Sequence, residues 1–284
     1  MPQTLRIETD GAVRSLVLCR AGEYNTITEQ LRDDLGAAID AADRDDAIKV
    51  ILLHGEGPAF CAGFGLDWST MAQAAGEGAE RGWDSVADLG MIGQYAAVFS
   101  KLHTCSKPTI AAVQGWCVAG GTDLAFNSDI ILCSHSARFG YPPARVWGVP
   151  EQPWLWVARL GLQAARRYLF TGDEISSLEA ERLGLVWKRV PDEGLMKEST
   201  ELARRIALMP LNQLKMMKLV LNEAAHRAYD PHTSRLLGCI FDGVARHTEE
   251  GRAFVARAGE IGWRDAVRER DRPFGDYGET KSKS

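Results

Sequence analysis

Two short apolar runs in the chain each lead into a turn that is rich in glycine. The runs are residues 48–55 (IKVILLHG) and 108–115 (PTIAAVQG), and both are β-branched and close on glycine. Such runs predict buried strands of a parallel sheet that is covered on both faces. The turns that follow, residues 59–66 (AFCAGFGL) and 115–124 (GWCVAGGTDL), then lie at strand exits. This pattern predicts a protein of the α/β class.

The second turn has the form of a helix start. Gly120 and Gly121 precede residues 122–126 (TDLAF), whose spacing suits the first turns of a helix on the sheet. A helix start has unpaired N–H groups and a positive partial charge, so Gly120 can hold an anion. The turn at Gly63 and Phe64 can supply a second donor. The alternative is that each glycine only marks a tight turn.

Regular elements are predicted along most of the first two thirds of the chain. Residues 5–8 and 13–19 predict an opening hairpin around an Asp-Gly turn, and residues 29–42 a helix capped by Thr28. A changeable stretch runs from residue 68 to residue 100. Further strands are predicted at 129–133, 137–139 and 185–190, with helices near 153–160, 163–170 and 177–183. Residues 140–151 hold three prolines and two glycines, which predicts a loop.

Every pattern from residue 196 onward is helical, with helices predicted at 196–207, 211–227, 233–247 and 249–261. We therefore divide the chain into an α/β core over residues 1–195 and a helical C-terminal region over residues 196–284. The C-terminal region can pack against other subunits of an oligomer. It can equally cover the sheet of its own chain, and the sequence does not separate these two interpretations.

The composition is that of an ordinary globular protein. The chain has 284 residues, of which 45% are hydrophobic and 25% charged, and a net charge of −5. This balance does not favour nucleic-acid or membrane-surface binding. The first residues lack the pattern of a signal peptide and no run is long enough to span a bilayer, so we expect a cytoplasmic location. The six cysteines are scattered without CxxC spacing, so no metal site is expected.

Four spaced motifs resemble those of one enzyme superfamily. They are residues 59–63 (AFCAG), 107–115 (KPTIAAVQG), 129–131 (DII) and 169–175 (LFTGDEI). In this order they resemble the crotonase superfamily, the enoyl-CoA hydratase/isomerase group, and the similarity extends from Asn25 to about Arg270. The resemblance implies a spiral of repeated β-β-α units with a helical C-terminal region, assembled as a homotrimer or a homohexamer.

The resemblance also implies an acyl-CoA substrate and no further cofactor. By motif position, the thioester oxygen lies between the backbone N–H groups of Phe64 and Gly120, with Ala62 beside the substrate. Two preorganised donors of this kind form an oxyanion hole that stabilises an enolate. The phosphates of CoA need local cations, and Arg20, Arg268 and Arg270 are the candidates by position. The alternative for each arginine is a solvated surface position.

The chain departs from the family at the catalytic acids. Hydratases of the family use two glutamates; this chain has Asp123 at the first position and Pro143 at the second. A proline cannot act as acid or base, so ordinary hydration is in doubt. Glu151 lies where dienoyl-CoA isomerases and chlorobenzoyl-CoA dehalogenases of the family place an acidic residue. We therefore predict that Asp123 and Glu151 form the catalytic pair.

The remaining predicted contacts concern the acyl group. Tyr141, Arg145 and Trp147 follow the Phe-Gly motif and are candidates for the wall of the acyl pocket, with Trp68 on the other side. The sequence leaves three functions open. The first is double-bond isomerisation or an atypical hydration; the second is thioester hydrolysis or C–C cleavage with Glu151; the third is acyl-CoA binding without catalysis.

Overall fold

The first of two β-sheets forms the centre of the molecule. The computed structural model describes residues 3–65 and 84–277. In the order β1-β2-β3-β5-β7-β10, this sheet contains six strands. Only β1 and β2 pair in antiparallel fashion; the other neighbours are parallel. The strands are Leu5–Asp10, Val13–Leu18, Val50–Gly55, Thr109–Val113, Ile130–Ser134 and Lys188–Val190.

A second, smaller sheet contains the strands that follow β3, β5 and β7 along the chain, together with β9, which follows helix α5 (Pro153–Thr171). Its order is β4-β6-β8-β9, with bounds Ala59–Cys61, Trp116–Val118, Arg138–Gly140 and Ile175–Ser176. The chain thus steps from the first sheet to the second three times, from β3 to β4, from β5 to β6 and from β7 to β8. Helix α4 (Gly120–Phe126) directly follows β6. This arrangement confirms the predicted α/β spiral of β-β-α units.

Helices α1 (Glu29–Arg44), α3 (Ser85–Thr104) and α5 (Pro153–Thr171) contribute to the main apolar core. Helix α1 begins as predicted, because the Thr28 side chain accepts a hydrogen bond from the Leu31 N–H. Its buried side chains Leu31, Leu35 and Ile39 recur at helical spacing on one face. Helix α6 (Ser177–Arg182) is a short helix after β9. The main core thus joins these helices to the sheet.

Helix α3 corrects one prediction. The sequence shows a changeable stretch over residues 68–100, whereas residues 85–104 form a regular helix of 20 residues. Asp84 caps this helix through its side chain, and the buried residues Ile92, Tyr95 and Phe99 lie on one face. Packing of this face overrides the two glycines inside the helix, which favour irregular structure on their own.

Two other predicted segments can be compared in detail. Residues 153–171 carry the single label α5, but Gly161, with a φ of +72° and a ψ of 158°, divides them into two helices, which agrees with the prediction of helices near 153–160 and 163–170. The loop over 140–151 contains one turn of 3-10 helix, η2 (Pro142–Arg145), where no regular element was predicted. A proline at the start of such a turn is favourable because its missing N–H has no partner there.

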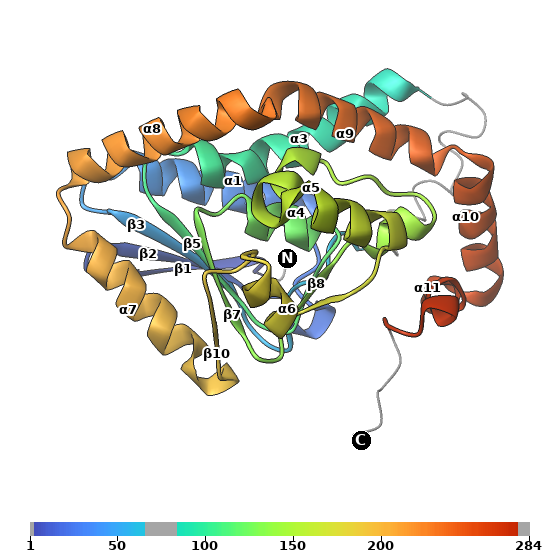
Figure 1. The fold of residues 1–284 in the computed structure, drawn as a ribbon, viewed down its shortest axis with the longest axis horizontal. Helices are drawn as coiled ribbons and strands as arrows, with labels where there is room; N and C mark the ends of the chain where they lie inside the picture. Colours follow the sequence, from blue (N-terminus) through green and yellow to red (C-terminus); the bar gives the residue numbers. More distant parts are fainter. Residues whose placement is uncertain (1–2, 66–83, 278–284) are drawn as a thin grey trace.

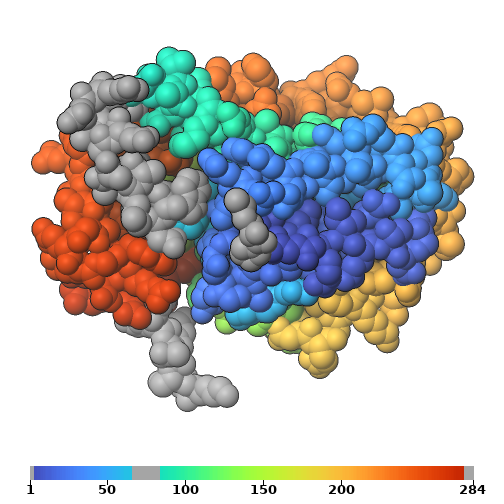
Figure 2. Space-filling model, turned by 180° about the vertical axis from the view of Figure 1, so that it is seen from behind, coloured from blue at the N-terminus to red at the C-terminus, as the bar shows by residue number. Residues whose placement is uncertain are grey.

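The C-terminal helices divide into those that cover the sheet and those that do not. Helix α7 (Leu195–Ala207) packs Leu195 and Ala203 on the face of the first sheet opposite the main core. Helices α8 (Leu211–Tyr229) and α9 (Pro231–Arg246) form an arch across the side of α1 and α3 (Figure 1). Helices α10 (Glu249–Ile261) and α11 (Trp263–Asp271) and the turn η4 (Arg272–Phe274) lie at one end of the molecule (Figures 1 and 2). The interpretation that this region covers its own sheet therefore holds for α7.

A buried lysine fastens α8 to the body of its own chain. The Lys218 ammonium donates to the carbonyls of Leu102 and Lys107, at 2.8 and 2.9 Å, and pairs with Asp129 at 2.8 Å. The outer side of α8 is apolar and exposed, at Met216, Met217, Leu219, Val220 and Leu221. The trimeric or hexameric assembly stays a prediction. Among the described residues, no helix is both long and apolar enough to cross a membrane.

Candidate active site

The two glycine turns lie side by side because the strands before them pair. Strands β4 and β6 are parallel, with Ala59 opposite Trp116 and Cys61 opposite Cys117, so both exit at the same edge. Gly63 adopts a φ of +83°, a conformation that favours glycine. A β-carbon placed on Gly63 would lie only 3.2 Å from the backbone nitrogen of Gly120. The residues predicted as the two donors are therefore neighbours in space.

In the part of the chain that the structure describes, the N–H groups of these two donors are not used by the fold. Phe64 forms a bridge with Ile27 in which the Ile27 N–H donates to the Gly63 carbonyl at 2.8 Å. Gly120 is the first residue of α4, so its N–H has no acceptor within the helix. Within residues 3–65 and 84–277, neither N–H donates a hydrogen bond. This geometry suits an anionic oxygen, and the oxyanion hole stays a prediction.

A turn at residues 20–25 supports the first donor. The Ala62 N–H donates to the Tyr24 carbonyl at 3.0 Å, and the Asn25 side chain donates to the Ala59 carbonyl at 2.8 Å. The Arg20 guanidinium donates to the carbonyl of Thr26 at 2.7 Å and also pairs with Glu23. Ala62 thus lies beside the donor, and its contact with the substrate stays a prediction, while Arg20 also stabilises the turn. Contact of Arg20 with CoA stays a prediction.

The two predicted carboxylates are buried close together. Asp123 is in the first turn of α4 and Glu151 stands just before α5; they are 1% and 3% exposed. Both oxygens of Asp123 and Oε2 of Glu151 have no hydrogen-bond partner among the described residues. An unpaired buried carboxylate is unfavourable in its charged form. These groups are therefore poised to take up or exchange a proton.

Burial is the main cause of their raised pKa values. It raises the pKa of Asp123 to about 8, with a further contribution from the charge of Asp242. The nearby backbone N–H groups of Gln152 and Glu151 oppose this rise. Burial, then Asp123 and Asp242, raise the pKa of Glu151 well above its ordinary value. Carboxyls with such pKa values serve as general acids and bases near neutral pH.

Pro143 lies at the position that the motifs predict for the second hydratase glutamate. This residue belongs to η2, and its carbonyl accepts N–H hydrogen bonds from Val146, Trp147 and Gly148 at 2.9 to 3.1 Å. Tyr141, just before η2, does lie near the carboxylates. Its hydroxyl donates to the Val149 carbonyl at 2.9 Å, and its pKa is raised by burial and then by Asp242, Asp123 and Glu151.

Arg145 lies elsewhere than the sequence predicts. Its guanidinium pairs with Asp271 at 3.0 Å, Asp276 at 2.6 Å and Asp173 at 3.3 Å, and it stacks on Phe274 at 3.8 Å. All these partners lie outside the carboxylate site, and three of them belong to the C-terminal segment. Because η2 turns the chain between Tyr141 and Arg145, the arginine fastens this segment and does not line the acyl pocket.

Trp147 is also a packing residue. Its ring lies 5.4 Å from that of Phe254 on α10, in a small core between α10, α11 and the end of the loop. We predicted it as pocket wall; the short turn after Pro143 instead directs it toward the C-terminal helices. Trp68, the predicted wall on the other side, falls outside the described residues.

The two C-terminal arginines, Arg268 and Arg270, differ in the exposure of their side chains. Arg268 is 70% exposed at its side chain and pairs with Asp265 at 2.7 Å, a weak surface contact. Arg270 pairs with the buried Asp271 at 2.7 Å and is only 10% exposed. Arg268 thus has the mobility needed to meet a phosphate, while Arg270 is held by the fold. Both contacts with CoA stay predictions.

Three further residues at the site were not predicted. Asp242 and Arg246 of α9 form an ion pair behind the two carboxylates. Tyr95 of α3 places its ring edge-on to Phe64 at 5.0 Å, and its hydroxyl is buried without a partner among the described residues. The i,i+4 spacing of Asp242 and Arg246 is visible in the sequence, but it equally describes a surface pair.

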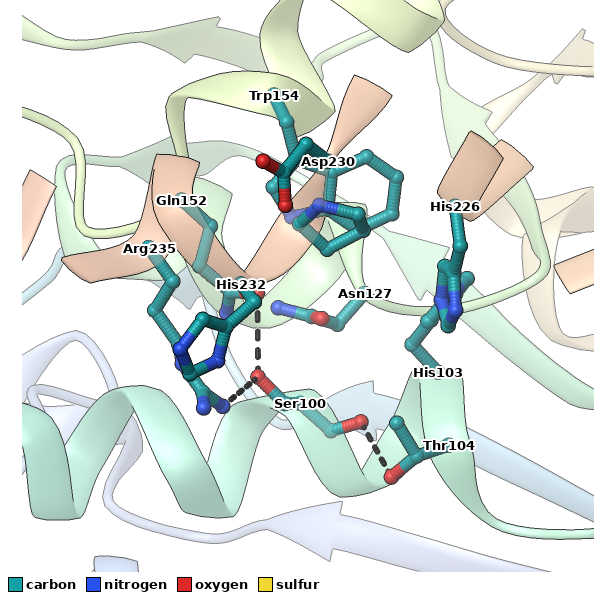
Figure 3. A pocket seen from close by; sticks show the side chains of 11 residues that line it. Ser100, His103, Thr104, Asn127, Gln152, Trp154, His226, Asp230, His232 and Arg235 are labelled. Atoms are coloured by element: carbon teal, nitrogen blue, oxygen red, sulfur yellow. Dashed lines mark hydrogen bonds between the residues drawn. The ribbon is translucent and has the colours of Figure 1, made fainter. Parts of the chain in front are cut away.

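A pocket of about 330 Å³ lies beside this site (Figure 3). Gln152, the neighbour of Glu151, lines it, and the Ser100 hydroxyl donates to the Gln152 side chain at 3.1 Å. Asn127 also lines it and donates to the Asp123 carbonyl at 2.6 Å. None of the predicted site residues that the structure describes lines the pocket, so it flanks the backbone that holds the carboxylates.

Comparison with known proteins agrees with this geometry. The family model for enoyl-CoA hydratase/isomerase matches residues 8–251. The mitochondrial Delta(3,5)-Delta(2,4)-dienoyl-CoA isomerase of Dictyostelium discoideum is 30% identical, over 88% of this chain and 84% of that protein. The 1,2-epoxyphenylacetyl-CoA isomerase of Escherichia coli K12 is 28% identical, over 81% of this chain and 86% of that protein.

A solved structure gives the same result for the fold. The crystal structure of an enoyl-CoA hydratase from Mycobacterium smegmatis superposes with a TM-score of 0.91 at 41% identity, and covers 97% of this chain and 96% of that one. With its paired strand exits, buried carboxylates and matching relatives, the chain belongs to the enoyl-CoA hydratase/isomerase family, the crotonase superfamily.

Proposed function

We propose that the protein is an acyl-CoA isomerase that moves a double bond by proton transfer between two carbons of the acyl chain. This proposal rests on the pair of buried carboxylates, Asp123 and Glu151, and on the proline at the position of the second hydratase glutamate. Isomerisation needs one base and one acid and consumes no water. Hydration in this family uses two glutamates, of which this chain has neither.

The proposed reaction starts at the carbon next to the thioester. A carboxylate removes a proton there, and the negative charge passes to the thioester oxygen. The N–H groups of Phe64 and Gly120 stabilise this oxyanion, for which loss of one donor costs about 3 kcal/mol. A carboxylic acid then delivers a proton to a carbon further along the conjugated chain. The double bonds move, and no electrons or atoms are gained or lost.

The surroundings of the two carboxyls support a division of roles. The charged form of Asp123 is favoured by nearby backbone N–H groups and by its place in the first turn of a helix. Besides burial, the negative charges of both Asp123 and Asp242 raise the pKa of Glu151 and so favour its protonated form. We therefore assign Asp123 as the base and Glu151 as the acid. Arg20, Arg268 and Arg270 remain the proposed contacts for the CoA phosphates, and no other cofactor enters.

The test combines two substrates with a mass measurement. A 3,5-dienoyl-CoA should give a product of unchanged mass whose double bonds are conjugated with the thioester. Absorbance detects the shift of the diene, and mass spectrometry checks that no water has been added. Asp123→Asn and Glu151→Gln should each lower kcat by about 10²–10⁴-fold, the usual contribution of a general acid or base. Asp10→Asn, which removes an exposed carboxylate paired with Arg204, is the matched control and should leave the rate unchanged.

The same assay separates the alternatives. Crotonyl-CoA that gains the mass of water faster than the diene isomerises would replace the proposal by hydration. Release of free CoA would replace it by thioester hydrolysis. Full activity in both Asp123→Asn and Glu151→Gln would show that this pair is not catalytic, whatever the reaction.

A further inference from the structure

Helix α9 brings a third carboxylate to the site. Asp242 is 5% exposed, and its two oxygens have separate partners. Oδ1 accepts a hydrogen bond from the Val149 N–H at 3.2 Å, and Oδ2 accepts one from the Arg246 guanidinium one turn further along α9. One side chain thus joins α9 both to a buried cation and to the segment that carries Glu151.

The segment over residues 149–151 is held mainly through its backbone. Tyr141 donates to the Val149 carbonyl, while Asp242 accepts from the Val149 N–H. Helix α9 approaches it so closely at Gly238 that an added β-carbon would lie 2.6 Å from the carbonyl oxygens of Pro150 and Glu151. Because Glu151 Oε2 has no partner among the described residues, the position of this carboxyl depends on that backbone.

The buried charges at the site do not balance. The groups that face the carboxyl pair are Asp242, Arg246 and Cys239 of α9, Cys117 of β6, Tyr141 before η2, and Tyr95 of α3. Burial, above all, raises the pKa values of the two phenols and the two thiols, which keeps them neutral near pH 7. Three ionised carboxylates would then face one guanidinium, and such an excess of buried negative charge is strongly unfavourable.

The bonding partners indicate where the charge and the proton lie. Arg246 binds Asp242 directly, through a hydrogen bond of the strong, charge-assisted kind. Burial alone would lower the pKa of Arg246, but Asp242 raises it overall. Neither oxygen of Asp123 nor Oε2 of Glu151 has a hydrogen-bond partner among the described residues, and the charge of Arg246 only partly offsets the rise in the pKa of Glu151. The proton that reduces the excess charge therefore belongs to the Asp123–Glu151 pair.

We propose that Asp242, paired with Arg246, is a positioning residue that fixes the 149–151 backbone and retains one proton on the Asp123–Glu151 pair. This inference rests on the proposed function for its catalytic meaning. A pair that shares one proton offers an acid and a base at the same pH. Both groups ionised, or both protonated, would lack one of the two.

Three substitutions separate the two roles of Asp242. Asp242→Asn keeps an oxygen for the Val149 N–H but removes the charge, so the pair should lose its proton at lower pH. The alkaline limb of kcat/KM should move down by at least one pH unit, with KM little changed. Asp242→Ala removes both contacts and should cost more than tenfold at every pH. Asp242→Glu keeps the charge and should restore the limb to within half a unit of the unsubstituted enzyme.

Asp10→Asn is the matched control for the loss of a paired carboxylate and should leave the profile unchanged. An alkaline limb that stays in place in Asp242→Asn would overturn the electrostatic role. A kcat/KM in Asp242→Ala equal to that of the unsubstituted enzyme would overturn the positioning role.

Infrared spectroscopy supplies a readout that needs neither turnover nor a substituted Asp242. At pH 7 the unsubstituted enzyme should show the carbonyl stretch of a protonated buried carboxyl, which Asp123→Asn or Glu151→Gln alters. Absence of that band overturns this inference even if the enzyme isomerises its substrate. A band present in an enzyme that isomerises none of the substrates overturns the proposed function and leaves the protonated pair established.

Discussion

The two halves of the site are built in different ways. The donor turns at Phe64 and Gly120 come from short strands that pair with each other, so backbone geometry alone sets their distance. The carboxylates come from α4, from the segment before α5 and from α9, and packing between distant segments brings them together. Substitutions in the first half should therefore change the stability of the folded protein. Substitutions in the second half should lower the activity before they lower the stability.

The largest effect is expected for Gly121→Ala in the first half. A β-carbon there would lie 2.2 Å from the Cys61 carbonyl oxygen, where the first turn of α4 meets the end of β4 backbone to backbone. Such overpacking against backbone should lower Tm by about 10 °C or leave no soluble protein. Gly93→Ala in α3, where the added carbon meets open space, is the control and should keep or raise Tm. A stable, active Gly121→Ala enzyme would contradict the close approach of the two turns.

The next effect is expected in the second half, for Gly238→Ala. The added carbon would displace α9 from the carbonyls of Pro150 and Glu151. Since a helix can move away from a loop, the protein should fold, while kcat falls by about 10–100-fold because a misplaced catalytic group is ineffective. Circular dichroism and steady-state kinetics measure the two outcomes. Gly259→Ala on α10 adds a carbon in open space and should change neither.

The same contrast explains what the sequence could predict. Turns, strand exits and the helix start at Gly120 follow from residues close together in the chain, and these predictions were confirmed in the fold. Asp123 and Glu151 were identified by resemblance, because their motif positions are fixed relative to those turns. Asp242 could not be found this way, because its contact with Val149 joins residues 93 positions apart.

Arg145 shows the opposite difficulty. Its place in the loop suggested the acyl pocket, but its role depends on where Asp271 and Asp276 return to the body of the protein. No local pattern contains that information. The same holds for Tyr95, which belongs to a helix that two glycines made hard to predict, and whose contact with Phe64 depends on how α3 packs.

A smaller effect, on stability, is expected for Asp123→Asn as a function of pH. Burial raises the pKa values of Asp123, to about 8, and of Glu151, so the proton that the pair retains stabilises the folded protein fully below pH 4, and this contribution is lost as the pH rises toward 8. The unsubstituted protein should therefore lose stability over this range, and Asp123→Asn should lose less. Calorimetry should show the Tm of Asp123→Asn exceeding that of the unsubstituted protein by a few degrees at pH 8, and by less at pH 5.

Asp10→Asn is the control here too, since it removes an exposed carboxylate. It should follow the pH dependence of the unsubstituted protein. If the Tm of Asp123→Asn depended on pH in the same way as that of the unsubstituted protein, Asp123 would ionise at its ordinary pKa. The Asp123–Glu151 pair would then retain no proton.

The smallest effect is expected for Ala119→Gly, in the first half. Ala119 precedes Gly120 with φ of +51° and ψ of −129°, a conformation that glycine adopts far more readily than alanine. Relief of about 1–3 kcal/mol of strain should slightly exceed the entropic cost of the glycine and the loss of one methyl group. Tm should stay constant or rise by about 2 °C, with kcat unchanged. Ala47→Gly, at an exposed turn position outside the positive-φ residues, should lower Tm instead. If Ala119→Gly lowers Tm as much as Ala47→Gly, strain is absent at this turn, and strand pairing alone holds the two donors together.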